Sequence, residues 1–397
     1  MATLEWKSTN HAMNRGWRSS CSPVHRMKLL VQPGDGLAPL VKGINEARIS
    51  IEILIFRFDR AEIETALVNA LKRGVAVRAL IAHTNRGGES RLRALESRLL
   101  GAGITVARTA GDLVRYHGKM MIVDGRELYL LAFNFTGLDI ERSRSFAVIT
   151  DDKAVVREAI RLFDADSKRL PYAPERDDFV VSPLNSRKIL SEFIKGAKTQ
   201  LLVYDPAVTD PAILRALQER SKAGVEIRLL GRLSRKAAAG IEAHSLAMRL
   251  HTRMMIRDGV DVFLGSQSLR TAELDARREI GLIFSDPKIT ARVIETFEAD
   301  WAASKDGKAR SEDTDTAEEQ PSIDTVAKKV AKSITKSLPP MGPVLEVIVR
   351  ELSETRTEVE VDTKQLEASV RDAVKSAVKE AVAVAVEQAV PATSESQ

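Results

Sequence analysis

Residues 51–81 read IEILIFRFDRAEIETALVNALKRGVAVRALI, and residues 200–230 read QLLVYDPAVTDPAILRALQERSKAGVEIRLL. Each stretch starts with an apolar run typical of a strand, continues with an amphipathic helical pattern, and reaches a second apolar run after a glycine. Two strands joined through a helix favour parallel pairing, so both stretches predict an α/β fold. The predicted elements are strands 51–56 and 201–204, helices 61–72 and 211–222, and strands 75–81 and 225–230.

A second pair of matching words follows each of these stretches. Residues 116–133 read YHGKMMIVDGRELYLLAF, and residues 250–267 read LHTRMMIRDGVDVFLGSQ. An Asp-Gly pair between two apolar runs predicts a β-hairpin. The chain is therefore predicted to hold two copies of one lobe, related by a pseudo-twofold axis. The predicted organisation is a first lobe 28–172, a connector 173–183 and a second lobe 184–303, with a helix 89–100 and a strand 104–108 inserted in the first lobe.

Composition limits the class of protein and of partner. The 397 residues contain 44% hydrophobic residues and a single cysteine, which excludes an internal disulfide and a cysteine-based zinc site. From residue 304 onward, 13 Lys and Arg stand against 18 Asp and Glu, so this tail carries −5 and the preceding body +10. A basic body indicates a polyanionic substrate such as a phosphate ester, nucleic acid or anionic lipid. Simple solubility is the alternative explanation of the charge.

The two ends of the chain differ from the lobes. Residues 1–27 form an N-terminal leader without the apolar run of a secretory signal, and no stretch reaches the roughly 18 apolar residues of a membrane span. We therefore expect a cytoplasmic protein whose contact with a membrane, if it has one, is peripheral. Residues 304–340 are predicted to be a disordered linker. Residues 341–397 are predicted to be a C-terminal helical tail that docks on the body or self-associates, because valine recurs every four residues between 370 and 390.

The two hairpin words each contain a histidine followed two residues later by a cation: His117 with Lys119, and His251 with Arg253. Residues i and i+2 of a strand share a face, so each imidazole lies beside a positive charge. That pairing disfavours a protonated imidazole, but it suits a site in which the cation holds a phosphate while a neutral histidine attacks phosphorus. Asp124 and Asp258 follow at the turns, where they can receive an imidazole N–H. Asp is also common in such turns for backbone reasons.

The doubled H-x-K-x4-D word in a duplicated strand–helix–strand chain resembles the phospholipase D superfamily over residues 28–303. The resemblance implies two α/β lobes with one shared active site, no metal or other cofactor, and a phosphohistidine intermediate. It implies hydrolysis or transfer on phosphodiesters, of which phospholipids are one class and nucleic acids the alternative. His117, Lys119 and Asp124 match the first motif in full. His251 and Asp258 match the second, where Arg253 replaces the usual lysine with a longer, planar cation.

The family often follows each motif with Gly-Ser-x-Asn, whose polar groups hold the phosphate. Asn134 keeps one half of that pattern in the first copy, and Ser266 keeps the other half in the second. A downstream acid that holds a histidine survives as Glu279, while Ser145 stands at the matching place. The bland alternatives are strand-end polar groups for Asn134 and Ser266, and an ion pair with a neighbouring arginine for Glu279.

Three functions follow from these residues. The first is a metal-independent phosphodiesterase or phosphatidyltransferase of phospholipase D type, similar to the cardiolipin synthases and acting on phospholipid head groups, with His117 as nucleophile and His251 as general acid. The second is a nuclease of the same superfamily, favoured by the basic body. The third is a phosphate-binding module whose catalytic site has decayed, suggested by Arg253 and Ser145.

Overall fold

The computed structural model describes residues 26–83, 89–233 and 240–306. Both lobes lie in one compact unit that, among these residues, contains 26–83, 98–233 and 240–306. The first lobe comprises β1 (Met27–Gln32), α1 (Ala38–Glu46), β2 (Ser50–Ile55), α2 (Ala61–Lys72), β3 (Ala76–Ile81), α3 (Glu89–Gly101), β4 (Thr105–Arg108), β5 (Arg115–Tyr116), β6 (Met120–Val123), β7 (Glu127–Leu131), α4 (Gly137–Glu141), β8 (Ser143–Thr150) and α5 (Lys153–Lys168).

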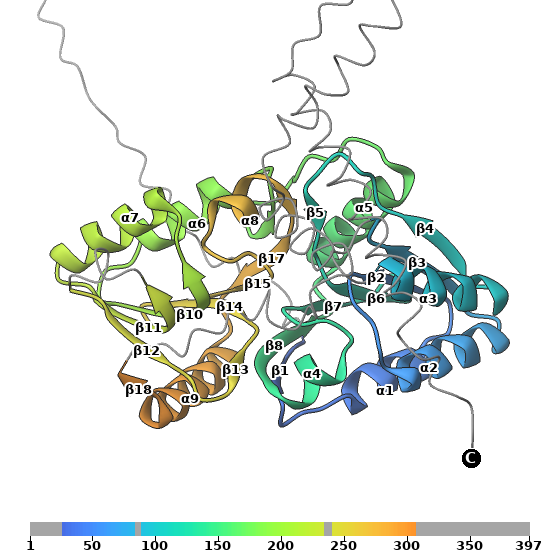
Figure 1. Cartoon of the computed structure of the whole chain (residues 1–397), viewed down its shortest axis with the longest axis horizontal. Helices are drawn as coiled ribbons and strands as arrows, with labels where there is room; N and C mark the ends of the chain where they lie inside the picture. Colours follow the sequence, from blue (N-terminus) through green and yellow to red (C-terminus); the bar gives the residue numbers. More distant parts are fainter. Residues whose placement is uncertain (1–25, 84–88, 234–239, 307–397) are drawn as a thin grey trace, which may run out of the picture. The chain divides into compact units, whose positions relative to one another are not determined.

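Among its described residues, the second lobe repeats this order except that it has no counterpart of α3 and has two additional short strands, β16 and β18 (Figure 1). It comprises β9 (Phe179–Val181), α6 (Ser186–Lys195), β10 (Gln200–Val208), α7 (Pro211–Lys222), β11 (Glu226–Leu233), β12 (Glu242–Ser245), β13 (Arg249–Leu250), β14 (Arg253–Arg257), β15 (Asp261–Gly265), α8 (Thr271–Asp275), β16 (Arg277–Arg278), β17 (Ile280–Phe284), α9 (Pro287–Ala303) and β18 (Lys305–Asp306).

The two main sheets have the same strand order, which confirms the α/β fold and the duplication. The first runs β1-β8-β7-β6-β2-β3-β4, and the second runs β9-β17-β15-β14-β10-β11-β12-β18. In each sheet the strand–helix–strand unit supplies a parallel pair, β2 with β3 and β10 with β11, while the hairpins pair antiparallel. The helices α2 and α7 have the bounds that the sequence predicts.

The Asp-Gly pairs form the predicted hairpin turns. Asp124 and Gly125 have φ values of 54° and 60°, and Asp258 and Gly259 have 52° and 66°. Positive φ at both central residues is the geometry of a type I′ turn, which glycine adopts freely and aspartate tolerates. The turns therefore return each strand tightly and fix the register of the strand that follows each histidine.

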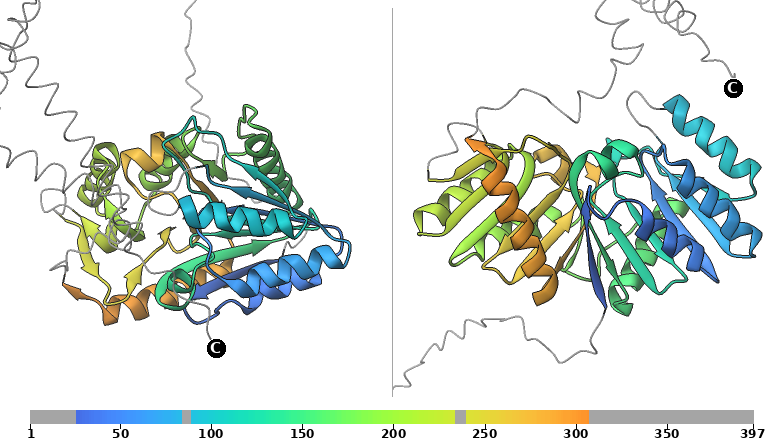
Figure 2. Two further views of the ribbon diagram at one scale, coloured as in Figure 1. Left: turned by 45° about the vertical axis from the view of Figure 1, so that its right-hand side comes forward. Right: turned by 90° about the horizontal axis from the view of Figure 1, so that it is seen from below.

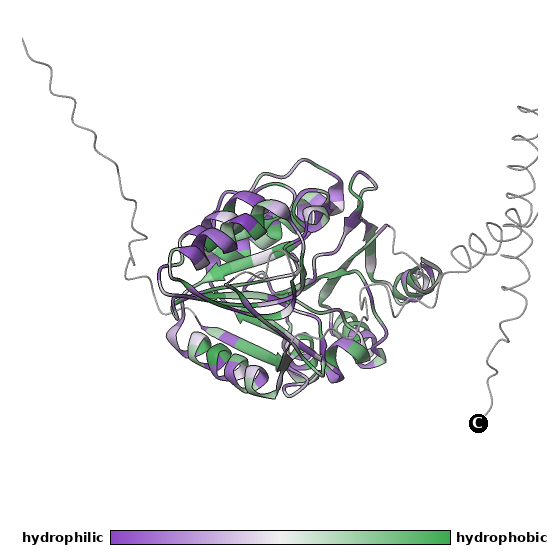
Figure 3. Ribbon diagram, turned by 60° about the vertical axis from the view of Figure 1, so that its left-hand side comes forward, coloured by the Kyte–Doolittle hydropathy of each residue, from purple (hydrophilic) through white to green (hydrophobic). Residues whose placement is uncertain are grey.

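Alternating residues of β10 send side chains into two cores. Leu202 and Tyr204 join a core shared by both lobes, together with Phe163 of α5 and Phe297 of α9. Leu201 and Val203 join a second core beneath α6 and α7. In Figure 3 the strands inside are largely green, which marks apolar residues, and purple, hydrophilic residues lie on the outer faces of the helices. One continuous apolar core therefore joins the lobes.

Short strands also exchange between the lobes (Figure 2). β5 of the first lobe pairs with β16 of the second, and β13 of the second lobe pairs with β8 of the first. Two matched ion pairs reinforce the contact: Arg144 to Asp300 at 2.7 Å, and Arg278 to Asp166 at 3.2 Å. These exchanged strands lead directly into His117 and His251.

The domain boundaries differ in detail from those that the sequence suggests. The connector 173–183 contains β9, which pairs with β17, so the second sheet begins at residue 179. The predicted linker starts at residue 304, yet β18 lies within it and pairs with β12. The leader up to residue 25, the rest of the linker and the C-terminal helical tail lie outside the described residues. Within the described ranges, no helix has the length and apolar composition needed to cross a bilayer.

Candidate active site

The four matched motif residues are buried where the lobes meet. As whole residues, His117, Lys119, His251 and Arg253 are 3% exposed or less. The backbone amide of His117 donates to the carbonyl of Arg278, and that of His251 donates to the carbonyl of Arg144. Each histidine is thus anchored to the opposite lobe.

The end of β7 links the two motifs. The amide of Leu131 donates to the carbonyl of Lys119, so the pairing of β6 and β7 continues to the residue two places after His117. Three residues beyond Leu131, the side-chain amide of Asn134 lies 3.4 Å from Nε2 of His251. The segment that follows β7 in the first lobe therefore reaches the second histidine.

His117 is held by Glu279, Lys119 and Phe56. Its Nδ1 lies 2.9 Å from Oε2 of Glu279, and Nζ of Lys119 lies 2.8 Å from Nε2 and 3.0 Å from Nδ1 of the same ring. The ring of Phe56 packs edge-on against the imidazole, with centroids 4.6 Å apart. Burial raises the pKa of the Glu279 carboxyl, although Lys119 and Arg277 oppose the shift. A proton on Nδ1 directed at Glu279 leaves Nε2 with a lone pair beside the ammonium group.

His251 is held by a different set of groups. Its Nε2 lies 3.2 Å from Oδ2 of Asp139 in α4, and its Nδ1 lies 3.2 Å from Nη2 of Arg249. Arg249 and Asp139 are themselves paired at 2.6 Å. Ser145, at the position that matches Glu279, donates its hydroxyl to the backbone carbonyl of His251 at 2.7 Å. The carboxylate beside this histidine therefore comes from a helix rather than from the matched strand position.

Asp139 is a stable buried anion. Burial alone would raise the pKa of its carboxyl, but the nearby His251 and Arg249 and the backbone amide of Asn134 lower it to about 2. Asn134 donates to Oδ2 of Asp139 twice, from its backbone amide at 2.8 Å and from its side chain at 2.7 Å.

Arg253 belongs to a buried network that the first lobe lacks. Its Nε donates to Oγ of Ser268 at 3.2 Å, and that hydroxyl donates to Oδ1 of Asp205 at 3.0 Å. Burial raises the pKa of the Asp205 carboxyl to about 6, against the opposing charge of Arg253. In the first lobe Ile55 occupies the position that matches Asp205, at the end of β2.

Asp124 and Asp258 require a correction, because neither contacts an imidazole. Asp124 accepts the backbone amides of Arg48, Ile49 and Ser50 at 2.6–3.1 Å, at the start of β2. Asp258 accepts the backbone amides of residues 198–200 in the same way. Burial would raise the pKa of each carboxyl, but these amides lower it. Both therefore tie the hairpin turn to the neighbouring strand, at the far end of the strand from the histidine.

The remaining predicted residues lie in the site or just behind it. Glu279 contacts the imidazole of His117, and Asn134 contacts both Asp139 and His251. Ser266 is fully buried and exchanges hydrogen bonds with the backbone of Ile280, so it supports the strand that carries Glu279.

Asp139, Arg249 and Asp205 were missed from the sequence. A usable signal existed for Asp139, because the matched position in the second copy, Glu273, is also acidic. Asp205 gave no such signal, since its match is the apolar Ile55.

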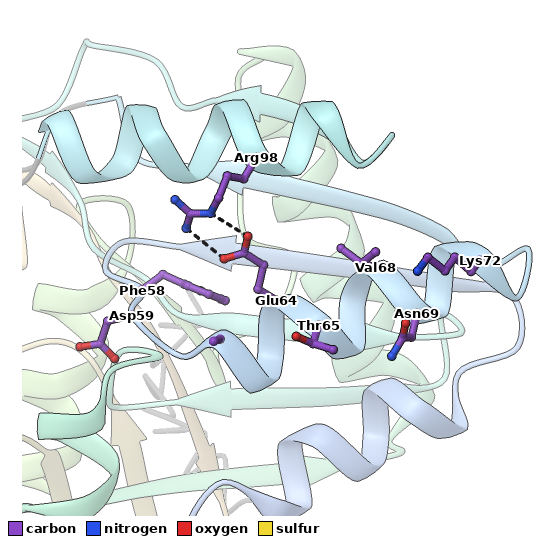
Figure 4. Close-up of a pocket in the computed structure, with 9 residues that line it drawn as sticks. Phe58, Asp59, Glu64, Thr65, Val68, Asn69, Lys72 and Arg98 are labelled. Carbon is purple, nitrogen blue, oxygen red and sulfur yellow. Dashed lines mark hydrogen bonds and ion pairs between the residues drawn. The ribbon is translucent and has the colours of Figure 1, made fainter. Parts of the chain in front are cut away.

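A separate cavity of about 530 Å³ lies beside α2, away from both histidines. Figure 4 shows Arg98 and Glu64 joined across it by paired hydrogen bonds of 2.8 and 2.9 Å. Among the residues that the structure describes, no group of three or more His, Cys, Asp or Glu side chains could hold a metal ion.

The family described as "Cardiolipin synthase, PLD-like domain" matches residues 40–167 and 190–301, which cover both lobes and all four motif residues. The chain belongs to this phospholipase D-like family. Its two matched segments end within a few residues of the C-terminal ends of α5 and α9.

Two curated relatives of this phospholipase D-like chain carry different names. "Polyphosphate kinase 1" of Chlorobaculum tepidum is 26% identical over 67% of this chain and 42% of its own length. "Mitochondrial cardiolipin hydrolase" of Danio rerio is 31% identical over 32% of this chain and 56% of its own length. The chain thus spans less than half of the polyphosphate kinase.

Solved structures show the same fold. Polyphosphate kinase from Porphyromonas gingivalis superposes on 70% of this chain and 47% of its own with a TM-score of 0.60 at 20% identity. Phosphatidylserine synthase from Haemophilus influenzae superposes on 70% of this chain and 87% of its own with a TM-score of 0.55 at 10% identity.

Proposed function

We propose that this chain is a phosphodiesterase or phosphatidyltransferase that works through a phosphohistidine on His117, needs no metal ion, and acts on phospholipid head groups. The observation that carries the proposal is the contact of Nδ1 of His117 with buried Glu279 at 2.9 Å, with the Lys119 ammonium 2.8 Å from Nε2 and 3.0 Å from Nδ1 of the same ring. A carboxylate on Nδ1 fixes the tautomer whose Nε2 lone pair can attack, and a cation beside the ring can hold the non-bridging oxygens.

The proposed reaction has two balanced steps. Nε2 of His117 forms a bond to phosphorus, the bond from phosphorus to the head-group oxygen breaks, and that oxygen takes a proton from His251. Water or an alcohol then attacks phosphorus, gives a proton to His251, and releases His117. The carboxylate of Asp139, 3.2 Å from Nε2 of His251, favours the protonated imidazole that the first step needs, while the Arg249 guanidinium, 3.2 Å from Nδ1, opposes it.

A second candidate substrate is polyphosphate. Curated polyphosphate kinases match up to 70% of this chain across both lobes, whereas the cardiolipin hydrolase matches 32%. The same nucleophile can take a phosphoryl group from an anhydride, with a phosphate as leaving group in place of an alcohol.

A substrate panel in EDTA tests the proposal. The full chain is incubated with phosphatidylcholine or phosphatidylglycerol vesicles, single-stranded DNA, polyphosphate with ADP, and bis(p-nitrophenyl) phosphate. Release of a lipid head group, with an adduct on His117 found by mass spectrometry after a non-acidic quench, is the expected result. DNA cleavage would make the chain a nuclease, and phosphate transfer to ADP would favour the second candidate. Phosphate binding without adduct or turnover would leave a binding module, and activity that EDTA abolishes and added metal restores would contradict the metal-free mechanism.

A further inference from the structure

Charged side chains of both signs surround the two histidines. Among them are the cations Lys119, Arg249 and Arg253 and the anions Glu279, Asp139 and Asp205. Each anion interacts with one of these cations. Asp139 forms an ion pair with Arg249 at 2.6 Å, and Glu279 is attracted electrostatically to Lys119. Asp205 is linked to Arg253 by hydrogen bonds through Ser268. These six side chains together contribute no net charge.

Asp139 lies among groups that would otherwise bind an anion. Its Oδ2 accepts hydrogen bonds from the backbone amide and the side chain of Asn134, and its Oδ1 accepts one from Arg249. Oδ2 also lies 3.2 Å from Nε2 of His251. The family resemblance assigns Asn134 to the substrate phosphate, and the proposed function assigns His251 to the leaving oxygen on that phosphate. The carboxylate therefore already supplies one negative charge to the half of the site that belongs to the second histidine.

We propose that Asp139 is a specificity-determining residue that restricts the site to phosphates with a single negative charge; the inference rests on the proposed function. A phosphodiester carries one charge, while a phosphomonoester or a terminal polyphosphate group carries about two near neutral pH. Like charges held a few ångströms apart in a buried site repel strongly, because little water screens them. The second charge of a monoester meets the carboxylate of Asp139, and the nearest cation, Arg249, is already paired with that carboxylate at 2.6 Å.

Two p-nitrophenyl esters with the same leaving group test this inference. Bis(p-nitrophenyl) phosphate is a monoanion and p-nitrophenyl phosphate is a dianion at pH 8, and neither leaving group needs protonation by His251. We expect the native protein to prefer the diester by at least 100-fold in kcat/KM. In Asp139→Asn that preference should fall at least ten-fold, because kcat/KM for the monoester rises.

Two variants control for other effects of the substitution. Asp139→Glu keeps the charge and should keep the preference for the diester. Asp164→Asn removes a carboxylate that pairs with Arg78 on the other side of the first lobe, and should also leave the preference unchanged. Thermal unfolding of each variant checks that it folds.

The outcomes separate this inference from the proposed function. Turnover of the diester and an adduct on His117, together with an unchanged preference in Asp139→Asn, would overturn the role of Asp139 alone. Equal losses with both esters would make Asp139 a structural residue and would overturn it as well. Absence of the adduct and of turnover with either ester would overturn the proposed function itself.

Discussion

His117 and His251 follow the matched short strands β5 and β13, yet the side chains around them differ. The first has its carboxylate on Nδ1, from Glu279 between β16 and β17, and a lysine within 3.0 Å of both ring nitrogens. The second has its carboxylate near Nε2, from Asp139 of a helix, and an arginine at Nδ1. Duplication preserved the backbone that delivers each histidine, while the side chains around it became specialised. The comparison teaches that the two histidines present different ring nitrogens to their carboxylates, Nδ1 in the first and Nε2 in the second.

The largest expected effect comes from removing the histidines one at a time. His117→Ala should lower kcat by at least about 10⁴-fold for every substrate, because no nucleophile remains. His251→Ala should abolish turnover of alkyl diesters but retain measurable activity on bis(p-nitrophenyl) phosphate, because p-nitrophenolate leaves without a proton. Steady-state rates on both substrates make the measurement. Equal rates in the two variants on both substrates would break the division of roles.

The matched acid positions give the next effect. Glu279→Gln should lower kcat on the order of 10²-fold, because the neutral amide no longer favours the Nδ1–H tautomer of His117. Ser145→Ala, at the matched position, should change kcat by less than about three-fold, because its hydroxyl bonds only a backbone carbonyl of His251. A fall of similar size in both variants would mean that the second histidine also depends on its strand position. Circular dichroism of each variant confirms that it folds.

The sequence predicts the fold better than the site, and particular residues show why. The strand–helix–strand repeat and the Asp-Gly turns are local patterns, so α2, α7 and both hairpins follow from them. The motif words also predict His117 and Lys119 correctly as neighbours, although these residues lie in the short connection between β5 and β6 rather than in a strand.

Contacts between the lobes follow no such local rule. Asp139 reaches His251 only because β13 of one lobe pairs with β8 of the other, and no pattern within either copy encodes that exchange. Asp124 is the opposite case. Its place in the motif suggests a contact with the histidine, but its carboxylate accepts backbone amides at the far end of the strand from that histidine. Contacts of side chains that depend on strand pairing between the lobes therefore could not be predicted from the sequence.

A smaller effect distinguishes the lobes through Asp205, which has no acidic match. Burial holds the pKa of this carboxyl at about 6, above its value of about 3.9 in an unfolded chain. The folded state therefore binds the proton more tightly, and the free energy of unfolding falls as pH rises from about 4 to about 6, by roughly 3 kcal/mol from this group at most.

Asp205→Asn should remove that dependence. Urea unfolding of the native protein and the variant at pH 4.5 and pH 7 gives the comparison. Because other groups titrate equally in both proteins, the drop in stability between the two pH values should be smaller in the variant by on the order of 1–3 kcal/mol. A drop of the same size in both proteins would mean that Asp205 is ionised as readily in the folded state as in the unfolded one.

The smallest effect should come from Asp124 and Asp258, the motif residues on which the two lobes agree. Asp124→Asn and Asp258→Asn keep a side chain that tolerates positive φ and still accepts a hydrogen bond, and they remove only the charge that the backbone amides stabilise. Each should cost about 1 kcal/mol of stability at pH 7 and leave kcat per folded molecule within about two-fold. The amides lower both pKa values, so the stability that these carboxylates add should be present near neutral pH and lost as pH falls below about 4. Urea unfolding and kcat measured on the same samples separate the two effects: a 100-fold loss of kcat in either variant without loss of stability would return that aspartate to the histidine of its motif.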